Sequence, residues 1–183
     1  MTHRFALFAA LSLLGAPAGA APPGELPPEI AAMLKEYVGE WKTTGWYSSA
    51  GKKEVMTWRW NCRNQNGLGL ACVWHYDWPD RPTNTEDELV GFDLQTGKLH
   101  FARLREDGSL QTALAEVNGK SLTRRWEWQE DGKAASGHIH IDTRVSGRWE
   151  QRITIKIDGK VVREGELTHT RVAPAAQPAG AGS

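Results

Sequence analysis

The chain has 183 residues, a length typical of one domain, and its 22 Lys and Arg balance its 22 Asp and Glu. This balance gives no cationic field for nucleic acid, and a hydrophobic content of 40% excludes a solvated, disordered chain. Tryptophan is unusually common, with nine copies beside three tyrosines and four phenylalanines.

The first 20 residues have the layout of a secretory signal peptide. A short basic start, His3-Arg4, precedes an apolar run that ends at Leu14, and Ala18-Gly19-Ala20 forms a small-residue cleavage site. We expect cleavage near Ala20 and a periplasmic or secreted mature protein. No later apolar run reaches the length of a membrane span, so we expect no transmembrane segment.

The next part of the chain predicts an extended leader and one short helix. Residues 21–28 are rich in proline and favour an extended backbone. Four apolar residues at helical spacing then predict an amphipathic helix over 29–37, which Gly39 ends. These apolar residues are Ile30, Met33, Leu34 and Tyr37.

From residue 40 onward, short strands alternate with turns that contain glycine. Pairs such as Asn66-Gly67 and Asp158-Gly159 favour tight hairpins, and no segment between strands could hold a crossover helix. The sheet is therefore predicted to be antiparallel and sequential. The ten predicted strands span 40–49, 53–63, 68–77, 86–93, 98–105, 109–117, 120–129, 134–144, 148–157 and 160–171.

Ten strands are many for an open twisted sheet, and closing the sheet removes its edges. We therefore predict an all-β fold over residues 29–172: an up-and-down barrel of about ten strands, with the helix closing one end. A two-sheet sandwich is the alternative. Residues 173–183 have no charge and no large apolar side chain, which predicts a disordered tail.

The two cysteines, Cys62 and Cys72, flank the turn at Asn66-Gly67. A hairpin centred there places them opposite one another, with Cα atoms about 4.5 Å apart, and an exported protein favours oxidised pairs. We therefore predict a disulfide between them. Free thiols are the alternative, and two cysteines without a further ligand make a poor metal site.

Alternation along the strands predicts which side chains point inward. The inward set on the second and third strands is Met56, Trp58, Trp60, Cys62, Leu68, Leu70, Cys72, Trp74, Tyr76 and Trp78. Later strands add Leu99, Phe101, Leu122, Trp126, Trp128, Trp149, Ile153 and Ile155. These aromatic residues either fill the barrel or line a cavity, and a ten-stranded barrel is wide enough to favour a cavity.

Three polar residues share the inward parity: Arg103, Arg124 and Gln151. A buried arginine must be paired or must meet an anionic ligand, because an unpaired buried charge is costly. The alternative is a bulge that turns the arginine outward.

The motif Val38-Gly39-Glu40-Trp41 stands at the first strand, and Thr168-His169-Thr170-Arg171 ends the last one. A Gly-x-Trp and a terminal arginine so placed resemble the calycin superfamily of lipocalins, fatty-acid-binding proteins and nitrobindin-like barrels. Residues 89–108 look like lipocalin-like secreted bacterial domains of unknown function. The resemblance implies that Arg171 packs across the Trp41 indole to close the barrel, and that the lumen binds a small hydrophobic or amphipathic molecule.

The same resemblance makes His169 the matching candidate for a haem ligand, because nitrobindin-like barrels carry such a histidine in the last strand. Thr43 stands where their pattern has a glycine, which counts against haem. His138 and His140 are predicted to face outward, and the run from Glu86 to Glu88 to be solvated. We expect no metal and no catalytic nucleophile.

The leading hypothesis is a non-catalytic exported barrel that holds a small hydrophobic or amphipathic ligand, with no catalytic residue. An anionic or polar end of the ligand would meet Arg124, Arg103, Gln151 or Tyr76, and its apolar part would lie on Trp58, Trp74 and Trp126. The alternatives are a haem-binding barrel, an enzyme acting on a lipophilic substrate in the same cavity, and an interaction protein with a solid barrel. A monomer or weak dimer is expected.

Overall fold

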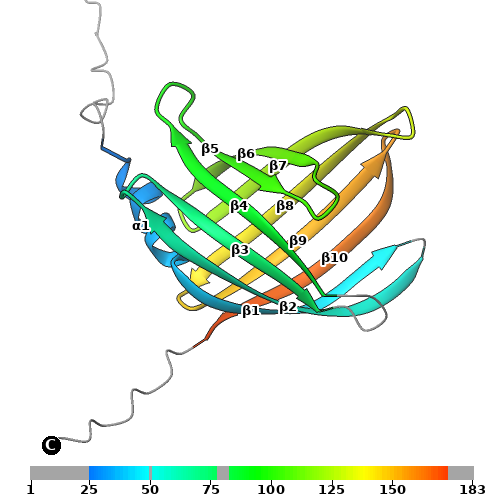
Figure 1. Cartoon of the computed structure of the whole chain (residues 1–183), viewed down its shortest axis with the longest axis horizontal. Coiled ribbons are helices and arrows are strands. Elements are labelled where there is room, and N and C mark those ends of the chain that lie inside the picture. The colour runs from blue at the N-terminus through cyan, green and yellow to red at the C-terminus, as the bar shows by residue number, and fades with distance from the viewer. Residues whose placement is uncertain (1–24, 50, 78–82, 173–183) are drawn as a thin grey trace, which may run out of the picture.

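The computed structural model describes residues 25–49, 51–77 and 83–172, which form one helix and a closed ten-stranded barrel (Figure 1). The predicted signal peptide and the tail lie outside the described residues, as does the leader up to residue 24. The helix is α1, Pro28–Tyr37. The strands are β1 Gly39–Ser49, β2 Lys52–Gln65, β3 Gly69–Asp77, β4 Asn84–Asp93, β5 Lys98–Leu104, β6 Leu110–Asn118, β7 Ser121–Glu130, β8 Lys133–Val145, β9 Arg148–Ile157 and β10 Lys160–Arg171.

The predicted architecture is confirmed. Every strand pairs antiparallel with its neighbours in the chain, and β1 closes the barrel by pairing with β10 from Trp41↔Arg171 to Ser49↔Arg163. This closure excludes the two-sheet sandwich. Asn66 and Gly67 have φ of 53° and 75°, the left-handed values that a tight hairpin turn requires.

The number of paired residues differs from one pair of neighbouring strands to the next. β1 and β2 pair over eleven residues of each strand, but β6 and β7 pair only from Leu114↔Arg125 to Asn118↔Ser121, which is five pairs. The register of this hairpin thus stops one residue before Trp126. Among the strand pairs of the barrel, β6 and β7 have the fewest paired residues.

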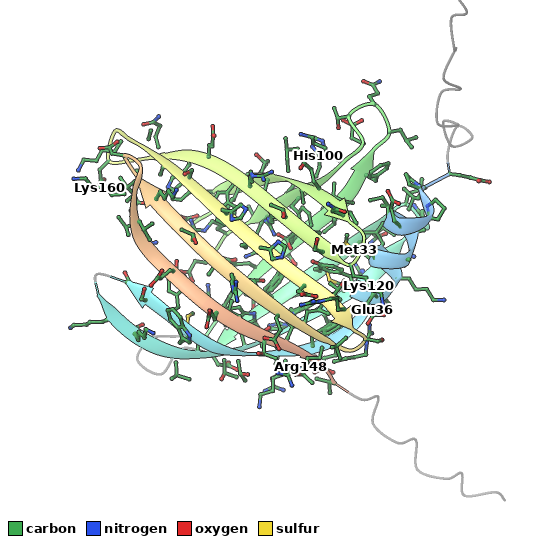
Figure 2. All side chains as sticks on the ribbon, turned by 180° about the vertical axis from the view of Figure 1, so that it is seen from behind. Met33, Glu36, His100, Lys120, Arg148 and Lys160 are labelled. Atoms are coloured by element: carbon green, nitrogen blue, oxygen red, sulfur yellow. A yellow bond between two sulfur atoms is a disulfide. The ribbon has the colours of Figure 1, made fainter. Side chains whose placement is uncertain are left out.

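The helix α1 closes one end of the barrel. Its four predicted apolar residues are buried. Tyr37 packs on Trp149 with ring centroids 4.3 Å apart, and Trp41 stacks on Trp60 at 5.1 Å. Figure 2 shows Met33 of α1 at this end, with Lys160 at the opposite end. No helix among the described residues has the length and apolar character of a membrane span.

Arg171 connects the helix to the first and last strands of the sheet. Its guanidinium carbon lies 4.5 Å from the centre of the Trp41 ring, and its two terminal nitrogens donate to the carbonyls of Glu36 and Val38. Gly39 has φ of 120°, and a Cβ there would lie 2.8 Å from an Arg171 nitrogen. Glycine is therefore required at this position by backbone conformation and by space.

Cys62 and Cys72 are directly paired across β2 and β3, with Cα atoms 4.1 Å apart, and they form the predicted disulfide. Both are buried in the barrel. One inward prediction nearby is wrong. Leu68 is 50% exposed because it belongs to the turn, where its N–H donates to the Gln65 carbonyl, and β3 begins only at Gly69. Trp78, also predicted inward, lies outside the described residues.

We expect Arg171→Ala to lower the free energy of unfolding by about 1–3 kcal/mol, because it removes the stacking on Trp41 and leaves two carbonyls without a donor. Arg171→Lys should recover little, since an ammonium lacks the planar fork that reaches both carbonyls. Urea unfolding measures both. The matched control is Arg148→Ala at the same end, where the side chain is 60% exposed in an ion pair with Glu150 and should matter little. Equal losses in Arg171→Ala and Arg148→Ala contradict this role.

Candidate functional site

A belt of aromatic and charged side chains crosses the inside of the barrel. Strand alternation brings them inward from β2, β3, β4, β5 and β7. We define the belt as Trp58, Trp74, Tyr76, Glu86, Glu88, Arg103, Arg124 and Trp126. Its aromatic part runs from Trp58 to Tyr76, with ring centroids 5.5 Å apart, and from Tyr76 to Trp74, at 6.5 Å.

The charged part of the belt is a network of two arginines and two glutamates. One oxygen of Glu88 accepts from Arg124 at 2.7 Å and from Arg103 at 3.1 Å. Arg103 also donates to the hydroxyl of Tyr76 at 3.0 Å and lies 3.5 Å from Glu86. The formal charges of these two carboxylates and two guanidiniums cancel.

The solvated character predicted for Glu86 and Glu88 is wrong. These residues are 7% and 2% exposed and point into the lumen, whereas Asp87 between them is exposed. The signal was present in the sequence, since both glutamates share the parity of buried Val90. The two inward arginines also require counter-charges, and the inward glutamates of β4, which pairs with β5, supply them.

Electrostatics hold this network in its charged state. Burial alone raises the pKa of the Glu88 carboxyl, but the guanidiniums of Arg103 and Arg124 outweigh burial and keep that pKa below its ordinary value. Burial lowers the pKa of Arg124, an effect that Glu88 opposes, while the glutamates overcome burial and raise the pKa of Arg103. The guanidinium carbons also lie over aromatic rings, Arg103 at 4.4 Å from the centre of the Trp74 ring and Arg124 at 4.4 Å from the centre of the Phe101 ring.

Several buried donors of the barrel interior have no partner. Among the described residues, every buried side-chain nitrogen or oxygen without a hydrogen bond is an N–H donor, and four of the five belong to the belt. They are Nε1 of Trp58, Trp74, Trp126 and Trp149, and Nε of Arg124. A buried donor left unpaired costs about 1–3 kcal/mol. The belt therefore presents a set of donors that an acceptor can satisfy.

Trp126 is positioned by a glycine of the neighbouring strand. Its indole lies across Gly137 of β8, where a Cβ would stand only 2.1 Å from the ring. Trp126 also stacks on Trp128, with centroids 6.3 Å apart, and Arg124 lies 5.9 Å from its ring. These contacts place the Trp126 ring near the guanidinium of Arg124.

Exposure of inward-facing side chains changes along the barrel axis. At the α1 end, Trp41, Leu99 and Trp149 are 0% exposed. Other inward apolar side chains are only partly buried, although they pack on the core; they are Tyr47, Met56, Trp128, Ile139 and Ile153. Tyr47 and Trp128 lie near the turns that are opposite α1, at the end of the barrel that we call the open end.

His169 is buried at the sealed end, 2% exposed, in a complete hydrogen-bond network. Its Nε2 lies 3.0 Å from the amide oxygen of Gln151, which only accepts, so Nε2 carries the proton. The hydroxyl of Thr43 lies 2.7 Å from Nδ1, and the Trp60 N–H points at both. Burial lowers the pKa of His169 to about 3, which keeps the ring neutral.

This packing does not fit a haem. An axial ligand must give one ring nitrogen to the iron, and both nitrogens of His169 already have partners. The network also explains Gln151, which the structure places beside His169 and not beside the two arginines. Of the predicted ligand-binding residues, the other six lie together in the belt.

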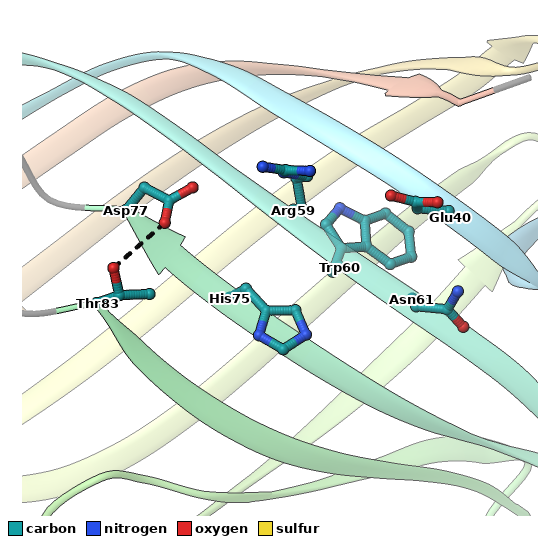
Figure 3. A pocket seen from close by; sticks show the side chains of 7 residues that line it. All are labelled: Glu40, Arg59, Trp60, Asn61, His75, Asp77 and Thr83. Carbon is teal, nitrogen blue, oxygen red and sulfur yellow. Dashed lines mark hydrogen bonds between the residues drawn. The ribbon is translucent and has the colours of Figure 1, made fainter.

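Two cavities lie outside the lumen. One, of about 480 Å³, is a shallow polar hollow on the outer wall of β1, β2 and β3, where Thr83 donates to Asp77 at 3.4 Å (Figure 3). It is lined by Glu40, Arg59, Trp60, Asn61, His75, Asp77 and Thr83. The other, of about 360 Å³, lies between α1 and the β2–β3 turn. His138 and His140 are exposed on the outer wall, as expected.

The belt is poorly suited to general acid–base catalysis. Its most buried carboxylate, Glu88, is held between two guanidiniums with a lowered pKa, whereas a general base works best with a pKa near the operating pH. Burial raises the pKa of the Tyr76 hydroxyl, which keeps it protonated. The arrangement is suited to binding by shape and hydrogen bonding.

Comparisons with known proteins add little to this description. The sequence matches no known family profile, and no curated protein matches it. Among solved structures, the S-type phycobiliprotein lyase CPES from Guillardia theta is similar, with 13% identity and a TM-score of 0.47 over 79% of this chain and 93% of that chain. A likeness of this size says nothing of what this barrel binds, and the calycin resemblance stays a prediction.

The neutral His169 makes stability depend on pH. Its folded pKa of about 3 lies below the ordinary value of 6.5, so the unfolded chain binds the proton first and stability falls as pH drops below about 6.5. Between about pH 7.5 and 5, we expect wild type to lose roughly 1–2 kcal/mol of unfolding free energy through this residue. His169→Gln should lose less over the same window, while the exposed control His140→Gln should follow wild type. Urea unfolding at both pH values measures this, and parallel losses in wild type and His169→Gln contradict it.

Proposed function

We propose that this protein is an exported, calycin-like barrel that binds a small, largely apolar molecule in the open end of its lumen and catalyses no reaction. Support for export comes from the signal-peptide pattern and from the disulfide, which persists in oxidising compartments. The closed ten-stranded barrel provides a lumen of the kind that holds small ligands.

The observation that carries this proposal is the set of unpaired N–H donors on the belt. Folding leaves Trp58, Trp74, Trp126 and Arg124 with buried donors that nothing in the described chain accepts. Such groups are rare in proteins, and a functional ligand is one of the few reasons to keep them. Partly buried apolar side chains share strand faces with these donors, Met56 with Trp58 and Trp128 with Trp126, so a ligand would meet hydrogen-bond donors and apolar side chains together.

Residues of this proposed site have distinct roles. The N–H groups of Trp58, Trp74, Trp126 and Arg124 hold the polar part of the ligand. Arg103 and Tyr76 keep the charged network in place and orient Trp74 and Glu88. The apolar part lies against the partly buried side chains of the open end, such as Met56 and Ile153.

Binding of Nile red, a neutral apolar dye, tests the site. We expect its fluorescence to rise with the purified mature protein, and native mass spectrometry of the exported protein to reveal a co-purified small molecule. Gly137→Ala should weaken dye binding about tenfold or more, because the new methyl group displaces Trp126 from its seat.

The matched control is Gly91→Ala, where an added Cβ meets no atom within 4 Å. It should bind the dye as wild type does, with both variants checked for folding by melting temperature. A folded Gly137→Ala that binds the dye as tightly as wild type removes the lumen as the site. Absence of dye binding by wild type, with no co-purified molecule, removes the proposed function.

A further inference from the structure

We infer that the ligand of the lumen carries uncharged hydrogen-bond acceptors, such as the carbonyl of an ester, ketone or amide, and no anionic or cationic head group. This inference rests on the proposed function and narrows the class of molecule. It replaces the expectation that the arginines receive an anion.

The charges of the belt are already satisfied by one another. Arg103 and Arg124 both bind the carboxylate of Glu88, and Arg103 also approaches Glu86. An anionic head group at Arg124 has to compete with a carboxylate at 2.7 Å and adds a third negative charge beside the two glutamates. The lumen would then hold an uncompensated charge in a poorly solvated space, which is strongly unfavourable.

A cationic head group is also unfavourable, because the anionic groups of the belt are already paired. Its only anionic partners in the belt are Glu86 and Glu88, which the two arginines occupy. The adjacent unpaired groups are N–H donors, which repel a cation. Arg105 lies 3.8 Å from Glu86 but is 49% exposed, so it stands outside the buried belt and water screens its charge.

The unpaired groups select for acceptors. The four unpaired belt donors come from β2, β3 and β7, and contacts through Tyr76, Arg103 and Glu88 connect them. No buried side-chain acceptor among the described residues is left unpaired, so a hydroxyl donor on the ligand meets no orphaned acceptor on the belt. One or two carbonyl or ether oxygens are what the belt lacks.

The test uses three naphthalenes of the same ring and similar size, which displace Nile red from wild type at about pH 7.5. Methyl 2-naphthylacetate is neutral and carries an acceptor, 2-naphthylacetate carries the anion, and 2-propylnaphthalene has neither. We expect the ester to bind about two- to tenfold tighter than the hydrocarbon and more than tenfold tighter than the anion.

Trp126→Phe tests the role of the N–H donors, because it removes one N–H group and keeps an apolar ring. It should erase part of the advantage of the ester and leave the hydrocarbon unchanged. Trp149→Phe is the matched control, since the Trp149 N–H is also unpaired but lies in the sealed cluster under α1, away from the open end. Its ester-to-hydrocarbon ratio should equal that of wild type.

Glu86→Gln tests whether the negative charge of the belt excludes an anionic head group. It removes one negative charge beside Arg103, so the anion should gain affinity relative to the ester, while Asp87→Asn, on the exposed face of the same strand, should change nothing.

Tighter or equal binding of the anion by wild type overturns the neutral head group. Equal binding of the hydrocarbon and the ester, or failure of the ester to displace the dye, overturns the acceptor. In each of these cases, Nile red binding still supports the proposed function. Failure of Nile red itself to bind is the result that removes the function as well.

Discussion

Closure of β1 on β10 is the constraint on which the rest of this structure depends. Without the pairing that begins at Trp41↔Arg171, ten twisted strands leave two open edges and no enclosed interior. The guanidinium of Arg171 connects this seam to the helix by stacking on the Trp41 indole and donating to the carbonyls of Glu36 and Val38 where α1 ends. The carboxylate of Glu36 extends the junction to the β8–β9 turn through the Gly147 N–H at 2.9 Å.

The sealed end that results gives the barrel two environments. Under α1, tryptophan rings pack without solvent, and even the polar residues His169, Thr43 and Gln151 satisfy one another. His169 is neutral there because burial lowers its pKa to about 3. Toward the open end, several inward apolar side chains are only partly buried. Aromatic packing is densest under α1, whereas four of the five unpaired donors lie in the belt.

The ion-pair network changes which kind of ligand the inward arginines indicate. An arginine on an apolar strand face suggests an anionic ligand only while its counter-charge is unknown. Here Glu88 binds both guanidiniums, and the sum of charge inside the belt is zero. The remaining capacity for recognition lies in dipoles, mostly indole N–H groups, and dipoles favour neutral acceptors over ions in a poorly solvated site.

The sequence by itself determined most of the architecture. Period-two alternation and glycine turns defined ten strands, because side-chain direction along a strand and positive φ in a tight turn are local properties. The Cys62–Cys72 pairing was predictable for the same reason, since a short hairpin fixes its own register. The inward placement of Arg103 and Arg124 also followed from parity within a single strand.

What only the tertiary structure decided was which distant residues meet. Glu86 and Glu88 share the inward parity of Val90, and Glu88 faces Arg103 across the neighbouring strand β5, but Arg124 on β7 reaches Glu88 only through the curvature of the closed barrel. Gln151 was grouped with the arginines by polarity, yet its place on β9 puts it against His169 on β10. The seat of Trp126 on Gly137 likewise depends on the register of two strands. Local pattern fixes the direction of a side chain, but its partners depend on how the sheet closes, and partners decide whether a buried charge or donor is satisfied.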